Sequence, residues 1–316
     1  MVAFKVTDDQ KFDWIPPQER TRQQMLITGE FHEQIGTFES RGQFLSDLPD
    51  RVLLYELEKK ALGQLMPRPH QKSGSCVGVG GARAYCHAQC GDVVVRGDYE
   101  EILFPFPFMT YGVGRQIAGF NRTGSGSYGG AQAKAVEQFG MLPYTDPRFP
   151  KPTIKNGWIA WTEREEIQWS HPKAWPVAYD DLKPDAEKYQ ILDVTRVTSI
   201  EGLLQALAQG YGVTTASSFG TRPRVSGDVL LGPWNTSWAH QQSWSGYWKH
   251  PRHGLIIPTD NQWNDVHGHC PTLYELGVTG SYWMYEKDVE KILRNGEVYA
   301  HSNTEGFPKR MPNFTL

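Results

Sequence analysis

Apolar residues follow helical spacing in the first half of the chain. After Leu48-Pro49-Asp50 they recur every three to four positions, at Leu53, Leu54, Leu57 and Ala61. This period predicts a helix that ends at Gly63 and the Pro67-Arg68-Pro69 sequence, since glycine and proline continue helices poorly. An earlier helix is expected over residues 19–33, and the aromatic-rich residues 99–118 are expected to form the core of a helical lobe.

Another predicted helix starts at Cys76 and is rich in very small residues, namely Gly78, Gly80, Gly81, Ala82 and Ala84. Glycine lowers helix stability, so several small residues together indicate close packing against another element. Further along, a glycine-rich turn over residues 124–130 leads into a helix over residues 131–140.

The hydrophobic period changes near residue 189, where strands begin to alternate with short helices. Strands are expected over residues 189–194 and 213–219, with a helix between them that ends at Gly210. Later strands are expected at His240 and over residues 254–257 and 280–284, followed by a short helix and a polar tail. The Trp-rich residues 145–185 are expected to cover a surface or to form an insertion in a lobe.

Length and charge limit the classes of function. The 316 residues suffice for one large domain or two lobes, and the net charge of −3 gives no basis for nucleic-acid binding. No apolar run approaches the roughly 18 residues of a membrane span, and residues 1–9 lack the apolar core of a signal peptide. We therefore expect no membrane contact and a cytoplasmic location.

The cysteines are too sparse for a secreted disulfide scaffold, and the pair Cys86 and Cys90 is expected to be reduced. A zinc site built from His87, these two cysteines and the His267-Gly268-His269-Cys270 sequence is an alternative. Its spacing matches no standard zinc site, so we predict no metal and no cofactor.

Cys76 is the strongest candidate for a reactive residue. The polar sequence Ser73-Gly74-Ser75 leads directly into the predicted helix that Cys76 opens. Unpaired N–H groups and the positive end of a helix dipole stabilise a thiolate at such a position, and thiolate is the nucleophilic form of cysteine. A buried cysteine that merely packs in a helix is the alternative.

The sequence resembles the papain-like cysteine peptidases, in particular bacterial and bacteriophage members, at several motifs in the same chain order. These motifs are Gln71 before Gly74-Ser75-Cys76, the Gly129-Gly130 turn, His240, Asn261-Gln262-Trp263, and the late Gly280-Ser281-Tyr282-Trp283 sequence. The resemblance implies an α+β fold of two lobes, one helical and one an antiparallel β-barrel-like lobe, with the active-site cleft between them. The implied division is an N-terminal extension (1–66), the helical lobe (67–185), the β-rich lobe (186–290) and a C-terminal tail (291–316).

The resemblance also implies a role for each motif residue. Cys76 would form the acyl-enzyme, His240 would act as base and acid, and Asn261 would orient His240. Trp263 would shield the contact between His240 and Asn261 from water. The oxyanion hole would consist of Gln71 and the backbone N–H of Cys76. The backbone of Gly129 and Gly130 would line the substrate cleft.

Two hypotheses about function remain open. The first is a cysteine peptidase that acts on peptide or protein substrates. The second is a weakly active or inactive papain-fold component with protein assembly partners, for example in a bacteriophage virion. The second gains support because Gln71 lies five residues before Cys76, one fewer than is usual in the family. The N-terminal extension is expected to be structural, with a removable inhibitor as the alternative.

Overall fold

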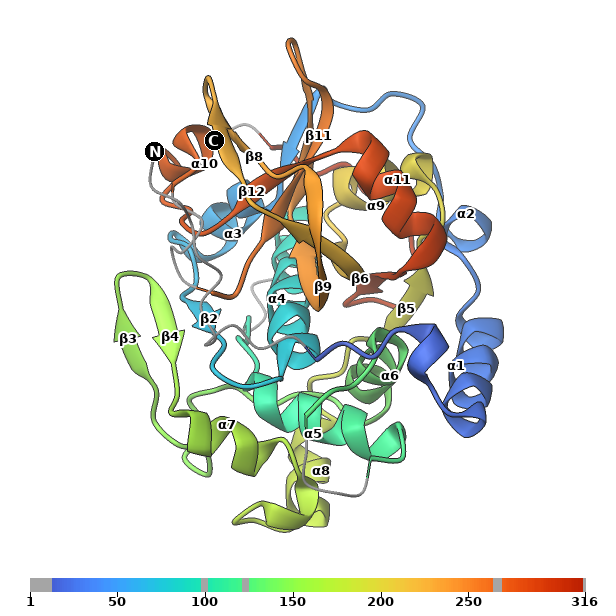
Figure 1. Cartoon of the computed structure of the whole chain (residues 1–316), viewed down its shortest axis with the longest axis vertical. Coiled ribbons are helices and arrows are strands. Elements are labelled where there is room, and N and C mark those ends of the chain that lie inside the picture. The colour runs from blue at the N-terminus through green and yellow to red at the C-terminus, as the bar shows by residue number, and fades with distance from the viewer. Residues whose placement is uncertain (1–12, 98–101, 121–124, 264–268, 315–316) are drawn as a thin grey trace.

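The chain forms two lobes on either side of one long helix, α4 (Cys76–Arg96). The computed structural model describes residues 13–97, 102–120, 125–263 and 269–314. In Figure 1 the strands of the large sheet gather in the upper half of the molecule, and the helices between residues 107 and 186 gather in the lower half. The helical and β-rich lobes expected from the change of hydrophobic period are both present.

The helices range in length from a single turn to the 21 residues of α4. They are α1 (Arg22–Ile35), α2 (Phe38–Arg41), α3 (Leu54–Leu62), α5 (Pro107–Ile117), α6 (Gly129–Gln138), α7 (Glu163–Trp169), α8 (Tyr179–Ala186), α9 (Ile200–Ala208), α10 (Pro271–Tyr274) and α11 (Glu286–Asn295). Helix α3 starts and ends within a residue of its predicted bounds, because its apolar stripe and the left-handed Gly63 define both ends.

The strands form one large and one small sheet. They are β1 (Arg51–Leu53), β2 (Arg68–His70), β3 (Thr153–Lys155), β4 (Trp158–Ala160), β5 (Asp193–Arg196), β6 (Gly212–Thr221), β7 (Arg224–Ser226), β8 (Val229–Leu231), β9 (Trp234–Trp244), β10 (Gly246–His250), β11 (Gly254–Asp260), β12 (Tyr282–Tyr285) and β13 (Glu297–Ser302). The large sheet runs β5-β13-β6-β9-β11-β12-β8-β7, with β10 joining β1 to β11. Within the described residues this path is open at β5 and β7, so the β-rich lobe is a curved sheet and not a closed barrel.

Three regions differ from the sequence-based division. Residues 297–302, expected in a polar tail, form the buried strand β13 between β5 and β6. Residues 51–53, expected in the extension, form β1 and pair with β10. The strand expected at 189–194 is β5, which starts only at Asp193. Pairing with distant strands decides all three, and local periodicity does not contain that information.

The small residues of α4 permit very close contacts with both lobes, as predicted. A Cβ placed on Gly80 would lie 2.8 Å from the carbonyl oxygen of Gln241 in β9. One placed on Gly78 would lie 2.5 Å from the carbonyl oxygen of Pro107 at the start of α5. Helix α4 is therefore clamped between the β-rich lobe and the helical lobe, and its first residue, Cys76, is held at their junction.

The Trp-rich segment is an ordered insertion of the helical lobe. Its hairpin β3–β4 adds to β2, and α7 packs against α5. Trp169 of α7 packs edge-on against Phe149 and Phe106 at centroid distances of 4.9 and 5.4 Å, and Trp175 lies 5.3 Å from it. These aromatic contacts fix α7 to the core of the lobe.

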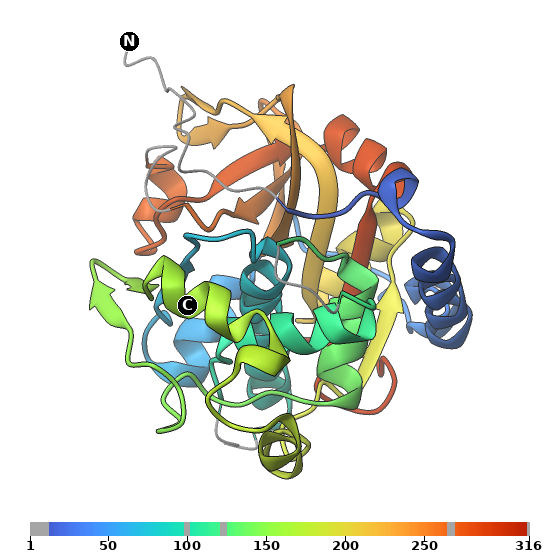
Figure 2. The ribbon, with the colours of Figure 1, turned by 60° about the horizontal axis from the view of Figure 1, so that its bottom comes forward.

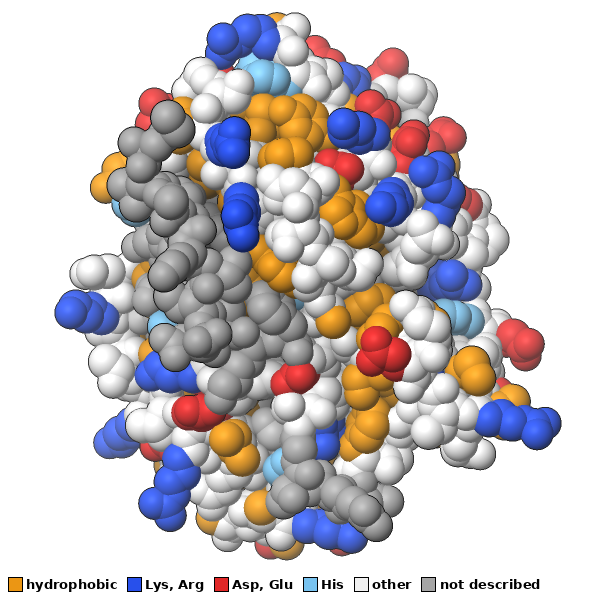
Figure 3. Space-filling view, in the orientation of Figure 1, with side chains coloured by type: hydrophobic (Ala, Val, Ile, Leu, Met, Phe, Trp, Pro, Cys, Tyr) orange, Lys and Arg blue, Asp and Glu red, His pale blue; other side chains and the backbone are white. Residues whose placement is uncertain are grey.

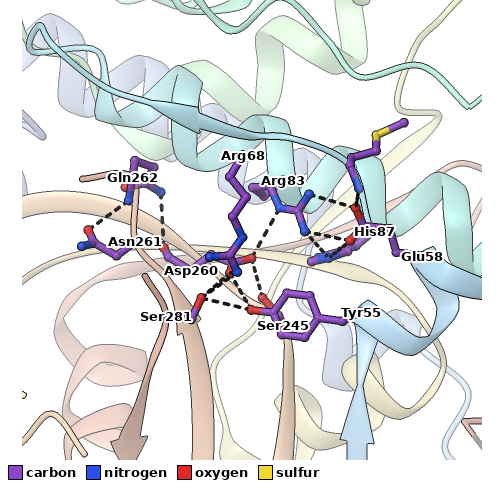
Figure 4. A network of polar contacts seen from close by, with 11 residues as sticks. Tyr55, Glu58, Arg68, Arg83, His87, Ser245, Asp260, Asn261, Gln262 and Ser281 are labelled. Atoms are coloured by element: carbon purple, nitrogen blue, oxygen red, sulfur yellow. Dashed lines mark hydrogen bonds and ion pairs between the residues drawn. The ribbon is translucent and has the colours of Figure 1, made fainter. Parts of the chain in front are cut away.

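A network of buried charges joins α3, α4 and the end of β11 (Figure 4). Glu58 accepts hydrogen bonds from the guanidinium of Arg83 at 3.1 and 2.8 Å. Asp260 accepts from Arg68 at 3.1 Å and from the hydroxyls of Ser245 and Ser281 at 2.7 and 2.8 Å. Because every one of these charges has a partner, the network avoids the large cost of an unpaired buried ion.

The buried Glu58 leads to a prediction about how the stability of the fold depends on pH. Burial alone raises the pKa of Glu58, but Arg83 and hydrogen bonds from His87 and Arg83 outweigh burial and lower it from 4.5 to about 2. Between these values the unfolded chain binds a proton that the folded chain does not, so the free energy of unfolding falls as pH falls from about 4.5 to about 2.

We expect Glu58→Gln to flatten this pH dependence and to lower the free energy of unfolding at pH 7 by ~3–5 kcal/mol, because Arg83 loses a buried partner. Urea unfolding at several pH values measures both effects. The control is Glu56→Gln on the same helix, whose pKa is raised mainly by burial. Identical pH profiles for Glu58→Gln and the wild type would contradict the prediction.

Candidate active site

Cys76 is the first residue of α4 and is fully buried. The loop before it is held by Tyr111, whose hydroxyl donates to the carbonyl oxygen of Gly74 at 2.6 Å and accepts from the N–H of Gly126 at 2.8 Å. The predicted junction of loop and helix is thus present, with the thiol at the positive end of a 21-residue helix.

His240 lies in the middle of β9, opposite Ser217 of β6. Its ring stacks on the indole of Trp263, with centroids 4.3 Å apart and an interplanar angle of 22°. Trp238 packs edge-on against the same indole at 5.2 Å. Trp263 therefore covers one face of the imidazole, and its expected shielding of a contact between His240 and Asn261 stays a prediction.

Helix α4 and strand β9 meet at the residues next to the two candidate catalytic groups. The Gln241 side-chain amide donates to the carbonyl oxygen of Val77 at 2.9 Å. Backbone N–H groups of Gln241 and Val77 both favour the thiolate form of Cys76. Segments that are far apart in sequence therefore bring Cys76 and His240 to the same junction between the lobes.

Asn261 and Gln71 lie near this junction but are engaged locally. Asn261 follows β11, and its Oδ1 accepts from the backbone N–H of Gln262 at 3.0 Å. The backbone N–H of Gln71 donates to the carbonyl oxygen of Gln262 at 2.9 Å, and its side-chain amide donates to the carbonyl oxygen of Ser73 at 2.7 Å. The roles implied for these two residues stay predictions.

Gly129 and Gly130 form the first turn of α6 and are buried. Their N–H groups donate to the two carboxylate oxygens of Glu297, at 3.1 and 3.2 Å. A Cβ on Gly130 would lie 2.9 Å from the hydroxyl oxygen of Tyr299, so close packing against β13 explains why glycine is needed there. The expected role of this glycine pair in lining the substrate cleft stays a prediction.

Residues 13–15 of the chain itself lie across the junction between the lobes, visible in Figure 2 as the dark blue segment that leads to α1. The N–H of Trp14 donates to the carbonyl oxygen of Ala239 at 3.0 Å, one residue before His240. Ser127 exchanges two backbone hydrogen bonds with the segment: it donates to Asp13 at 3.0 Å and accepts from Ile15 at 2.8 Å. The segment is thus bound as an extended peptide between both lobes.

The buried carboxylate of Glu297 ties this segment down. It accepts from the indole N–H of Trp14 at 2.8 Å and pairs with the buried guanidinium of Arg20. Arg20 also donates to the carbonyl oxygen of Ile15 at 3.1 Å and lies over the ring of Tyr128, 4.4 Å from its centroid. A single carboxylate thereby joins the start of α6 to the segment that crosses the site.

The crossing segment changes the chemistry of the nucleophile. Burial raises the pKa of Cys76 to about 12, and the carboxylate of Asp13 adds to the rise, while N–H groups from Asp13 and Gln241 partly oppose it. Gly74 leaves no space on this side, since a Cβ there would lie 1.5 Å from Oδ2 of Asp13. In this arrangement burial opposes the thiolate form that the helix position favours.

A pocket of about 260 Å³ opens beside the nucleophile loop. The loop, α5 and α7 contribute to its walls, with Ser73, Gly74, Tyr111, Ser125, Glu163, Ile167 and Ser170 as lining residues. It offers space for a side chain next to Gly74 that the crossing segment leaves open.

The remaining cysteines and histidines are placed in other contacts. All four cysteines are buried and unbridged, and Cys270 accepts a hydrogen bond from the indole of Trp283. Among the described residues, no group of three or more possible ligands is placed to hold a metal ion; His267 lies outside them. No described helix is long and apolar enough to cross a membrane. On the face in Figure 3, positive and negative side chains are interspersed.

Sequence reasoning missed Ser127, Trp14 and Glu297. Ser127 stands two residues before the glycine pair, within the glycine-rich turn expected over residues 124–130. Glu297 and Trp14 are separated by 283 positions, and no local pattern connects them.

Comparison with known proteins supports the fold. No protein-family model matches the chain, and no curated protein matches it. Among solved structures, the chain is similar to xylellain, a cysteine protease from Xylella fastidiosa, with a TM-score of 0.61 and 16% identity over 95% of this chain and 99% of that one. Bromelain from Ananas comosus has a TM-score of 0.49 and 11% identity, covering 81% and 99%. The chain has a papain-like fold.

The contacts of Arg20 predict how access to Cys76 can be changed. Arg20→Ala removes the ion pair with Glu297 and the anchor of Ile15, so the crossing segment should open more often. We expect iodoacetamide to label Cys76 at pH 7 about tenfold faster or more, since ~1.4 kcal/mol in the opening equilibrium corresponds to a factor of ten. Mass spectrometry of the labelled peptide measures the rate.

The matched control is Arg22→Ala, which alters an exposed arginine two residues along. Cys76→Ala shows which label belongs to this residue. Equal labelling rates in the Arg20 and Arg22 variants would mean that the segment does not limit access to the thiol.

Proposed function

We propose that this chain is a cysteine peptidase that hydrolyses peptide bonds through an acyl-enzyme on Cys76. The observation that carries the proposal is the placement of Cys76 at the start of α4, at a junction between lobes where His240 is stacked under Trp263. Thiol catalysis needs a nucleophile and a base at one site, and the similarity of the fold to that of a cysteine protease supports these roles for Cys76 and His240.

Acylation would begin with transfer of the Cys76 proton to His240. The thiolate attacks the carbonyl carbon of the peptide bond, and the carbonyl oxygen takes up negative charge. The C–N bond then breaks as the imidazolium of His240 gives its proton to the leaving amine. The acyl group remains on the sulfur as a thioester.

Deacylation would reverse these roles with water as the nucleophile. His240 takes a proton from water, the hydroxide attacks the thioester carbonyl carbon, and the C–S bond breaks. Asn261 would hold the imidazole ring in the useful orientation, while Trp263 limits access of water to its covered face. The negative oxygen would be stabilised by the N–H of Cys76 and the amide of Gln71.

The crossing segment supports an extended peptide as substrate. Its backbone uses groups from both lobes, the N–H and carbonyl of Ser127 and the carbonyl of Ala239. A substrate peptide would take these same hydrogen bonds, so residues 13–15 have to leave before it binds. We therefore propose that the described arrangement is a latent form and that the N-terminal region acts as an inhibitor.

The second candidate function is a weakly active or inactive papain-fold component, including a role in a bacteriophage virion. One observation favours it: Cys76 is fully buried and has its pKa raised to about 12 beneath residues 13–15. A permanently filled cleft would leave the fold as a scaffold for protein partners.

Peptide hydrolysis by the full chain and by Arg20→Ala separates the two functions. With a mixture of fluorogenic peptides at pH 7, we expect hydrolysis by Arg20→Ala at about ten times the rate of the full chain or more, following the opening of the segment. Adding Cys76→Ala or His240→Ala to this background should abolish it. Arg22→Ala should behave like the wild type.

The opposite result has a clear meaning. If Arg20→Ala exposes Cys76 to alkylation but no peptide is cleaved, the peptidase proposal fails and the scaffold role is favoured. If hydrolysis persists in the Cys76→Ala background, the activity belongs to a contaminant.

A further inference from the structure

The insertion over residues 145–185 holds the loop before Cys76 at two points. Its strand β4 pairs in parallel with β2, where His70 stands opposite Ala160 directly before Gln71. Its helix α7 supplies the fully buried Glu166. The carboxylate of Glu166 accepts from the N–H of Ser73 at 2.7 Å and from the N–H of Lys72 at 3.0 and 3.1 Å.

Helix α7 is a rigid support for this carboxylate. Its carbonyl at Glu166 accepts from the hydroxyl of Ser170 at 2.6 Å, and the carbonyl of Trp169 accepts from the indole of Trp175 at 2.6 Å. Helix α5 approaches so closely that a Cβ on Gly112 would lie 2.7 Å from the carbonyl oxygen of Trp169. The position of Glu166 is thus determined by packing on both sides.

The contacts continue from Ser73 to the candidate oxyanion donor. The N–H of Ser73 is bound by Glu166, and its carbonyl oxygen accepts from the side-chain amide of Gln71 at 2.7 Å. The hydroxyl of Ser73 lies 3.1 Å from that of Ser75, next to Cys76. The orientation of the peptide groups around Ser73 therefore determines where the Gln71 amide lies.

We infer that Glu166 is a positioning residue that orients the Gln71 amide through Ser73, and that α7 supports the loop before Cys76. This inference rests on the proposed peptidase function. It assigns a purpose to the Trp-rich segment, and it makes Glu166 a positioning residue because its carboxylate contacts the backbone of Lys72 and Ser73.

A carboxylate suits this position better than an amide. Three backbone contacts from Lys72 and Ser73 point N–H groups at both oxygens of Glu166. Glutamine offers one acceptor oxygen and turns an NH₂ group toward one of these donors. The loop would have to shift to avoid that contact, while the volume of the side chain stays the same.

The experiment compares Glu166→Gln with Glu165→Gln in the full-length Arg20→Ala background. Glu165 is half-buried and caps the start of α7 with Thr162, so its variant is matched in sequence and chemistry. Burial raises the pKa of Glu166 to about 7, so assays at pH 8 keep the carboxylate ionised. We expect Glu166→Gln to lower kcat about tenfold or more with KM within twofold, since an oxyanion donor acts in the transition state.

A double-mutant cycle with Gln71→Ala tests the route. If Glu166 acts through the Gln71 amide, Glu166→Gln should cost less than about twofold in kcat once Gln71 is alanine. A general loss of stability would lower activity equally in both backgrounds. Thermal unfolding of each variant accompanies the kinetics.

The outcomes separate the inference from the function it rests on. The inference is overturned if Glu166→Gln leaves kcat equal to that of the Arg20→Ala background. It is also overturned if kcat falls equally with and without Gln71. Both results leave the peptidase proposal in place. A background that cleaves no peptide although Cys76 is exposed to alkylation overturns the peptidase proposal, and the positioning role with it.

Discussion

The structure depends on how closely α4 approaches the large sheet. A Cβ on Gly212 of β6 would lie 1.8 Å from the carbonyl oxygen of Ala84, and Gly80 meets the backbone of Gln241 in β9. Such contacts leave no room for side chains, so the register between helix and sheet is fixed. That register sets Cys76, at the start of the helix, beside the residues that flank His240. The place of the candidate site in the fold therefore follows from backbone packing.

Buried charges fix the parts of the site that the helix does not reach. Asp260, the last residue of β11, is bound by two arginines and by the hydroxyls of Ser281, just before β12, and Ser245, between β9 and β10. It directly precedes Asn261, so the network in Figure 4 holds the turn that carries Asn261 and Trp263. Glu297 plays a comparable part on the other side, where it binds the first turn of α6 and the crossing segment. Each carboxylate is stabilised by several donors, which makes both positions sensitive to substitution.

Latency and catalysis place opposite demands on the same groups. A thiolate needs N–H donors and some access to water, whereas the crossing segment excludes water and adds the charge of Asp13. The hydrogen bonds that hold residues 13–15 come from Ser127 and Ala239, on different lobes. In the proposed function, the backbone groups that would bind a peptide hold the chain's own segment, and the anchoring of Arg20 would decide between the two states.

The sequence by itself determined the α+β fold, the small-residue helix that Cys76 opens, and the order of the motifs that include His240 and Trp263. These features rest on local period, on turn residues and on short motifs, all of which act over a few positions. Only the tertiary structure decided that β13 lies inside the sheet, that Ser127 and not Gly129 or Gly130 pairs with an extended segment, and that Glu297 and Glu166 organise the surroundings of the site. Each of these depends on contacts between residues far apart in the chain, such as Trp14 with Glu297 or Ser73 with Glu166. Contacts between residues so far apart in the chain depend on how whole helices and strands pack. Local residue patterns do not contain that information.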